Sequence, residues 1–316
     1  MDHLTHSLTG LMMSRAGLSR FHARAPLALI LSANACDVDG LSLFSGGLTY
    51  IRYHRGLAHS IAFMPVMALL PLLIVAAIAR SFQGWLRLYL LCVAGVASHL
   101  LLDWTNTYGV RFFEPFSSAW IHLDINSLIE GWVWAVLIFA WLMVYLVRLV
   151  SREIGAKPAS GRGLAIFALA FFLVYDFGKY LAHQRAIAML NSRIYDGAMP
   201  VRVAAFPGGA NPFVWRGWVE TDAFFKTYRI NVDSDFDPGS GTKYYKPSDT
   251  GAIDAAKSSD VFRTFMWFDQ FPRWTVLPVA EPEGARQVQL MDLRLGFYAT
   301  AVVDRTNRVL ESSFRF

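Results

Sequence analysis

Long uncharged apolar runs dominate the first half of this chain. Residues 61–79 and 131–147 contain no Asp, Glu, Lys or Arg. A helix needs about 20 apolar residues to cross the hydrocarbon core of a bilayer, so both runs predict transmembrane helices. Residues 86–102 and 163–182 carry ionisable residues only near their ends. These two runs predict further spans with interfacial or functional ends.

Shorter apolar stretches come before the spans. Residues 8–18 and 25–36 are too short to cross a bilayer, which favours re-entrant or buried helices. The loop at residues 148–162 is short and rich in Arg, as is typical of a cytoplasmic connector. We therefore expect the opposite ends of the spans, and the C-terminal domain, to lie outside the cytoplasm.

The second half of the chain has a different pattern. A helical membrane domain is predicted for residues 1–182 and a connector for residues 183–199. Residues 200–316 alternate apolar and polar side chains between Pro, Gly and Asn, which predicts a small β-rich soluble domain. A helix is expected near residues 250–266. The predicted strands lie at residues 213–221, 224–232, 287–295 and 298–303.

Composition excludes several classes of protein. The chain is 54% hydrophobic and only 17% charged, which is unusual for a soluble protein. Its two cysteines, Cys36 and Cys92, lie in apolar surroundings and predict neither a disulfide framework nor a thiolate zinc site. The net charge of +5 comes without a basic patch interleaved with aromatic residues, so no nucleic-acid partner is expected. The N-terminus lacks the basic leader of a signal peptide, and no feature specifies an oligomeric state.

Two pairs of polar residues have helical spacing. Asp2 and His6 are four residues apart, as are His99 and Asp103. Residues with this spacing share one face of a helix and can offer two metal ligands together. Taken alone, such a pair is more often a capped or hydrogen-bonded structural pair.

Two further motifs flank the first predicted span. Asp37 and Asp39 follow the stretch at residues 25–36, where their alternation in a turn could direct two carboxylates at a cation, although Asp is common in turns. His54 and His59 come directly before the span. A straight helix would place these two histidines roughly 140° apart, so a turn must bring them together if they act jointly.

The alternation of spans gathers these motifs at one membrane face. Residues 54–60 precede the first span and residues 99–103 end the second, while Asp124 and Glu130 precede the third. Ionisable groups near hydrocarbon are costly unless they are paired, hydrated or bound to a metal. Nitrogen and oxygen donors suit Zn²⁺, or Mn²⁺ or Fe²⁺, as one or two ions. A buried polar network that joins helix ends is the alternative.

The order of these motifs closely resembles the YdjM/YfhP-like family of inner-membrane metal-dependent hydrolases. The resemblance covers roughly residues 1–135, and residues 211–217 resemble the extension of longer members. This chain has Cys36 where Pro is usual, and Glu130-Gly131 where Asp-Pro is usual. The signatures are Met-Asp-His-Leu-Thr-His-Ser-Leu-Thr-Gly at the start, then residues 35–39, 54–60 and 99–109.

The resemblance implies an integral protein of the bacterial inner membrane that hydrolyses a membrane-proximal ester. A phosphodiester or phospholipid headgroup is the expected substrate, as the set of ligand types is also similar to that of zinc-dependent phospholipases C. We expect Asp39 or His54 to act as general base or orienting group, and Arg55 to bind a phosphate or to anchor its helix at lipid headgroups. The expected metal ligands are His6, Asp37, His59, His99 and Asp103, and further family-like positions are Asp2, Asp124 and Glu130.

Two other classes of function remain open. One is a metal-binding transport or sensing protein, which would need a polar path through the bilayer. The span interiors are almost bare of ionisable residues, and this weighs against transport. The other is a non-catalytic protein whose β-rich domain binds a partner while the helices anchor it, and absence of metal affinity would favour that class.

Overall fold

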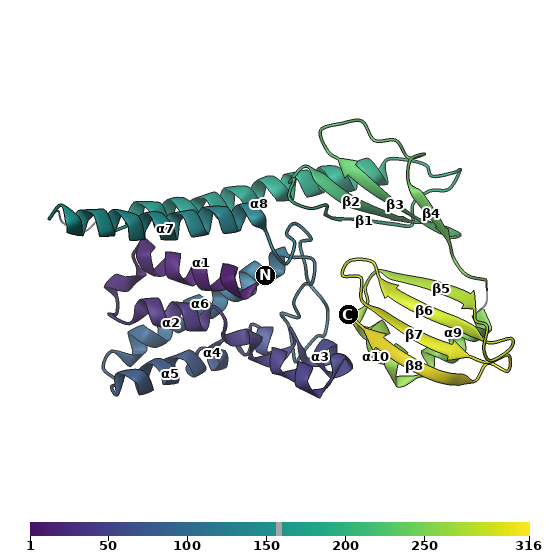
Figure 1. The fold of residues 1–316 in the computed structure, drawn as a ribbon, viewed down its shortest axis with the longest axis horizontal. Helices are drawn as coiled ribbons and strands as arrows, with labels where there is room; N and C mark the ends of the chain where they lie inside the picture. Colours follow the sequence, from purple (N-terminus) through teal and green to yellow (C-terminus); the bar gives the residue numbers. More distant parts are fainter. Residues whose placement is uncertain (156–159, 249) are drawn as a thin grey trace. The chain divides into compact units, whose positions relative to one another are not determined.

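The computed structural model describes residues 1–155, 160–248 and 250–316 (Figure 1). Its first part is helical, and its last part contains two antiparallel sheets. The helices before the sheets are α1 (His3–Ala16), η1 (Leu18–Arg20), α2 (Ala25–Ser32), η2 (Ala35–Ser45), α3 (Gly47–Tyr53), η3 (Leu57–His59), α4 (Met64–Met67), α5 (Leu69–Ala79), α6 (Trp85–Thr105), α7 (Gly131–Glu153) and α8 (Arg162–Asn191).

Within the described residues, three helices are long and apolar enough to cross a membrane: α6, α7 and α8. Up to five spans result if each of two bent helix pairs, 25–32 with 35–45 and 47–59 with 64–79, counts as one. This confirms a helical membrane domain with short helices at its start. α8 continues to Asn191, so residues 183–191 of the expected connector are helical, because no Gly or Pro interrupts them.

The run at residues 61–79 differs from the expected straight span. It forms α4 and α5, and together with residues 47–59 it makes a pair bent by 93°. Proline lacks a backbone donor and is tolerated in the first turn of a helix. Pro65 and Pro71 each fall in such a first turn, in α4 and α5 respectively, which fits the separation of these two helices at Ala68. The 93° bend itself lies ahead of α4, between residues 59 and 64.

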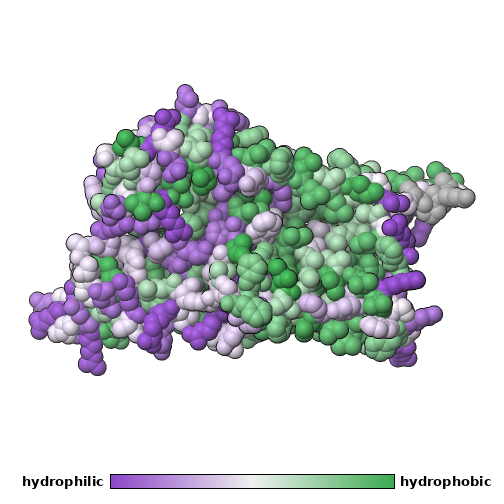
Figure 2. Space-filling model, turned by 180° about the vertical axis from the view of Figure 1, so that it is seen from behind, coloured by the Kyte–Doolittle hydropathy of each residue, from purple (hydrophilic) through white to green (hydrophobic). Residues whose placement is uncertain are grey.

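Large apolar side chains cover the outer faces of α7 and α8. Phe139 is 53% exposed and Leu173 is 75% exposed. In Figure 2 the sides of the helical part are hydrophobic, and hydrophilic side chains gather at the end where α7 ends. Exposed apolar surface of this extent marks contact with lipid.

Close packing of α2 against α1 and α6 shapes the helical part. A Cβ atom at Gly10 of α1 would lie 2.5 Å from the carbonyl oxygen of Leu29 in α2. A Cβ atom at Gly95 of α6 would lie 1.9 Å from Oγ of Ser32. Such small residues let helix backbones approach in a membrane protein. The packing brings the start of α1, the end of α2 and the end of α6 together.

The chain forms two compact units, and each is built from segments that are not consecutive in the sequence. One unit comprises residues 1–38, 55–185 and 206–215, and the other comprises residues 39–54, 186–205 and 216–316. In the second unit, α3 packs on the sheet domain, where the Arg52 guanidinium donates to Thr264 Oγ1 at 2.8 Å.

The C-terminal part contains two four-stranded sheets, ordered β1-β2-β3-β4 and β5-β6-β7-β8. Helices α9 (Thr250–Lys257) and α10 (Asp260–Phe268) pack on the second sheet, with Phe262 and Phe265 fully buried. The predicted β-rich domain is thus confirmed, with a helix pair where one helix was expected. The strands are β1 (Arg202–Pro207), β2 (Val214–Glu220), β3 (Phe224–Asn231), β4 (Thr242–Tyr245), β5 (Pro272–Pro278), β6 (Arg286–Asp292), β7 (Tyr298–Val303) and β8 (Val309–Arg315).

Candidate metal centre

Four side chains with metal-ligating atoms converge inside the helical part. Each offers one nitrogen or oxygen atom, and these four atoms lie within 4.8 Å of one another. Asp37 comes from η2 and His59 from η3, while His99 and Asp103 are one turn apart on α6. The two histidines and Asp103 are fully buried. The chain therefore concentrates ionisable groups where an isolated charge would be costly.

Distances within this tetrad fit one small cation. With metal–ligand bonds of about 2.1 Å, the ligand atoms of a tetrahedral zinc site lie about 3.4 Å apart. Nε2 of His59 lies 3.5 Å from Asp37 Oδ1 and 3.5 Å from Asp103 Oδ2. Nε2 of His99 lies 3.7 Å and 3.4 Å from the same two atoms, and the two Nε2 atoms are 3.1 Å apart. The donor set thus suits Zn²⁺, and its nitrogen and oxygen atoms also suit Mn²⁺ or Fe²⁺.

The end of α2 orients the His99 ring. His99 Nδ1 lies 2.7 Å from the carbonyl oxygen of Ala33. A carbonyl only accepts, so Nδ1 carries the proton and Nε2 presents its lone pair to the other donors. A hydrogen bond from the second ring nitrogen is the usual way in which a protein fixes a histidine ligand.

The two oxygens of Asp103 face different partners. Oδ2 faces His59 and His99, whereas Oδ1 accepts from Nη2 of Arg55 at 3.0 Å and contacts the amino group of Met1. Oδ1 also lies 3.4 Å from His6 Nε2. Asp103 therefore links the tetrad to a second set of polar groups.

His6 lies beside the tetrad without being part of it. Its ring stacks on that of His99 with centroids 4.0 Å apart. The ring is fully buried, and neither nitrogen has a hydrogen-bond partner among the described residues. Unsatisfied buried nitrogens are rare and call for an unseen partner, which is consistent with the expected ligand role of His6.

Arg55 is buried, with 3% of its surface exposed. Its Nη1 donates to Asn106 Oδ1 and to the Gly109 carbonyl oxygen, both at 3.1 Å, and its guanidinium stacks over Tyr108. These contacts, together with that to Asp103, indicate that Arg55 holds Asp103 in place.

A pocket of about 380 Å³ opens on the Asp37 side of the tetrad. Asp37 is the one tetrad member with an exposed side chain, at 11%, and its Oδ2 lies 3.0 Å from Nδ1 of His3. Asn34 also lines the pocket, and the remaining lining side chains are apolar, including Leu70, Pro71 and Ile74. The pocket is amphiphilic, with its polar end at the tetrad.

Asp39 and His54 form a pair of their own. Asp39 Oδ1 lies 2.7 Å from Nδ1 of His54, whose ring stacks on Tyr50. A carboxylate bonded to one imidazole nitrogen raises the basicity of the other. Their expected role as general base or orienting group stays a prediction.

Three further expected positions have other partners. Asp2 caps α1 by accepting from the backbone N–H groups of Leu4 and Thr5, and Asp124 lies 2.8 Å from His122. Glu130 accepts from Lys179 Nζ at 2.8 Å. None of the three belongs to the tetrad, so their role as additional ligands stays a prediction.

Sequence reasoning missed several groups that shape the centre. The sequence pattern did not single out His3, which contacts Asp37. The Ala33 carbonyl carries no signal in the sequence. Asn106, which supports both Arg55 and Asp103, follows Asp103 at a spacing of three residues, and that spacing could have indicated it.

Comparisons with known proteins identify a family and a distant relative. Residues 1–186 match the sequence profile of a family described as "YdjM inner membrane protein". A Bacillus subtilis (strain 168) protein described as "Uncharacterized protein YfhP" is 23% identical over 275 residues, which cover 86% of this chain and 78% of the relative. No solved structure matches the chain.

Proposed function

This chain belongs to the YdjM inner membrane protein family, and on that basis we propose that its tetrad is the centre of a metal-dependent hydrolase. The observation that supports the proposal is the near-tetrahedral spacing of Asp37, His59, His99 and Asp103 in a buried place. Ionisable groups inside a membrane domain pair with one another or mark a functional site, and the tetrad has the ligand types of a metal site.

The tetrad would hold a divalent ion, with Zn²⁺ as our first choice and Mn²⁺ or Fe²⁺ as alternatives. When bound, the ion would lower the pKa of water and stabilise negative charge on a substrate oxygen. The chain's own groups fix the ligands: Ala33 sets the tautomer of His99, and Arg55 holds Asp103. Neither ring nitrogen of His6 forms a hydrogen bond among the described residues. His6 is therefore our candidate ligand for a second ion, or an additional ligand of the first.

The pocket beside Asp37 suggests the substrate class. Its polar end, with His3 and Asp37, would take an ester headgroup, and its apolar wall, with Leu70 and Ile74, would take a hydrocarbon chain. Both wall residues are about two-fifths exposed on α5, a helix in one of the bent candidate spans. We therefore propose a membrane lipid ester, with a phosphodiester or phospholipid headgroup preferred.

A second function is favoured by the same geometry. Four protein donors close a tetrahedron in structural zinc sites, whereas catalytic sites keep a position for water. Among the tetrad side chains that the structure describes, that of Asp37 is exposed, so water would approach the ion on this side. If no such position is available, the chain binds its metal without hydrolysis, as a sensing or structural protein.

Elemental analysis of the detergent-purified full chain tests the proposal. We expect one or two divalent ions per chain, and their loss in His99→Ala and in Asp103→Ala. The matched control is His22→Ala, because His22 lies just before α2 and its Nε2 pairs with the Gln83 carbonyl oxygen. Stoichiometric metal in both tetrad variants would refute the ligand assignment.

Activity is measured on the same preparations with phosphatidylglycerol vesicles and with bis(p-nitrophenyl) phosphate. Hydrolysis that disappears with the metal in His99→Ala supports the hydrolase. Asp39→Asn should keep the metal but lose activity if the Asp39–His54 pair transfers protons. Metal at full occupancy without hydrolysis of either substrate would favour the non-catalytic alternative.

A further inference from the structure

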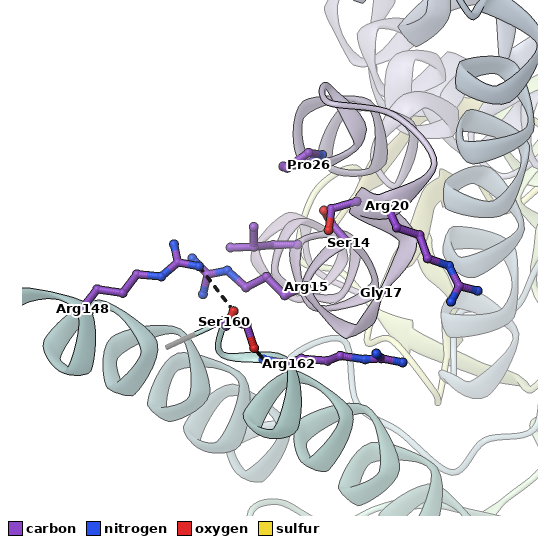
Figure 3. A pocket seen from close by; sticks show the side chains of 10 residues that line it. Ser14, Arg15, Gly17, Arg20, Pro26, Arg148, Ser160 and Arg162 are labelled. Atoms are coloured by element: carbon purple, nitrogen blue, oxygen red, sulfur yellow. Dashed lines mark hydrogen bonds between the residues drawn. The ribbon is translucent and has the colours of Figure 1, made fainter. Parts of the chain in front are cut away.

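A second polar site lies at the far end of α1 from the metal centre. His6 is in the first turns of α1, and Arg15 is in its last turn; the two are about 14 Å apart along the helix axis. Around Arg15 the structure forms a pocket of about 580 Å³ (Figure 3). None of the described residues that line this pocket is an Asp or Glu.

Four arginines from four elements line the pocket. Arg15 comes from α1 and Arg20 from η1, while Arg148 comes from the end of α7 and Arg162 from the start of α8. In Figure 3 the guanidinium groups of Arg15 and Arg148 extend toward one another. Arg15, Arg20 and Arg162 form no ion pair with a carboxylate in the part of the chain that the structure describes.

Two of these arginines donate hydrogen bonds to backbone carbonyl oxygens. Arg162 Nε donates to the Ala16 carbonyl oxygen at 2.9 Å, and Arg148 Nη2 donates to the Ser160 carbonyl oxygen at 3.3 Å. Nη1 of Arg15 has no hydrogen-bond partner among the described residues. A guanidinium carries five N–H donors, so Arg15 can donate to a further acceptor.

Two observations point to a missing anion. The hydroxyl of Ser14, which lines the pocket, is on a fully buried residue and has no hydrogen-bond partner among the described residues. Arg15 lies outside the long candidate spans, and burial, followed by the charge of Arg148, lowers the pKa of its guanidinium. Two guanidinium groups held close together repel one another unless an anion binds between them.

The place of the pocket indicates where that anion comes from. It lies where the candidate spans α7 and α8 end and begin, the level at which lipid headgroups meet a membrane protein. Leu18 and Phe21, on either side of Arg20, line a separate apolar pocket with Leu90 of α6. An acyl chain could follow that apolar surface while its phosphate stays with the arginines.

We propose that Arg15, Arg148 and the Ser14 hydroxyl bind a phosphate group, and that an anionic phospholipid supplies it. The planar fork of arginine matches phosphate oxygens two at a time. Arg20 and Arg162 flank the site and add positive charge. The site shares no lining residue with the tetrad, and the binding of an anion there does not require hydrolysis.

Native mass spectrometry of the full chain in detergent tests this proposal, with phosphatidylglycerol and phosphatidylcholine as competing lipids. We expect retained phosphatidylglycerol, and about tenfold weaker binding in Arg15→Gln and in Arg148→Gln, which corresponds to one lost charge-assisted contact. Arg152→Gln is the matched control, because Arg152 is exposed one turn beyond Arg148 and does not line the pocket. Arg15→Lys keeps the charge and serves if Arg15→Gln does not fold.

The outcomes separate the sources of phosphate. Equal retention of both lipids, or equal loss of phosphatidylglycerol in Arg152→Gln, would overturn a specific site. Inorganic phosphate at millimolar concentration is the second arm, read as a shift in thermal unfolding. A shift with inorganic phosphate that disappears in Arg15→Gln, without retained lipid, would support the phosphate site and overturn the lipid as its source.

Discussion

The buried ion pair between Glu130 and Lys179 offers the most quantitative test of this structure. Nζ of Lys179 lies 2.8 Å from Oε1 of Glu130, and the two side chains are 2% and 4% exposed. Tyr175 donates to the other carboxylate oxygen at 3.0 Å, and the Ser127 backbone N–H donates to Oε1 at 2.7 Å. Removal of one partner leaves a charge that water cannot reach.

Lys179→Met should lower the free energy of unfolding by about 3 kcal/mol, the lower end of the range for a broken buried pair, because two neutral donors still satisfy Glu130. Glu130→Gln should cost a similar amount. The double variant leaves no uncompensated charge, and we expect it to recover about 2 kcal/mol of the summed losses. Metal content should stay at the wild-type level in all three variants, because neither residue belongs to the tetrad.

The assay is equilibrium unfolding in detergent micelles, followed by tryptophan fluorescence and circular dichroism. The matched control is Lys246→Met, which removes a more exposed partner of Glu220 and should cost about 1 kcal/mol or less. Losses that simply add in the double variant would refute the argument that burial makes this pair interdependent. Loss of metal in Glu130→Gln would instead restore Glu130 as a ligand.

Three further predictions follow from single residues. Gly95→Ala should cost about 1–3 kcal/mol, since its Cβ would overlap Ser32, and should lower metal content by displacing α2, which elemental analysis would detect. Asp2→Ala should cost about 1 kcal/mol through the lost cap of α1 while metal content stays unchanged, and a loss of metal would contradict this. Burial and the charge of Asp292 raise the pKa of Asp269 well above its usual value. A carboxyl group whose pKa is raised in the native state makes the protein less stable as the pH rises through that pKa. Asp269→Asn should therefore raise the melting temperature at pH 7 and leave it nearly unchanged at pH 4. An equal shift of the melting temperature at both pH values would exclude titration of Asp269 as the cause.

Motif order predicted much of the candidate site because antiparallel spans return to the same face. His59, His99 and Asp103 lie near the ends of consecutive apolar runs, and topology alone places them together. Asp37 follows a short helix whose closing residues must lie close by. All four tetrad members were therefore predictable from spacing and hydropathy.

Other features depend on contacts that a sequence pattern does not encode. Glu130 and Asp124 have the same residue types as the tetrad acids, but their partners are Lys179 and His122. A pattern of acids near span ends cannot distinguish a partner cation in the chain from a metal. Hydropathy likewise shows how apolar a run of residues is, but not whether its helix is continuous. This is why residues 61–79 were expected to form one transmembrane helix.

Helix α2 is only eight residues long, yet it is part of both polar sites. Pro26, in its first turn, lines the arginine pocket, and Ala33, which follows its last turn, orients the His99 ring. A displacement of α2 by an anion would therefore rotate a ligand of the ion. By thermodynamic reciprocity, the ion must then change the affinity for the anion by the same factor. The lipid composition of the membrane and the supply of metal would then be sensed by one protein as a single coupled quantity.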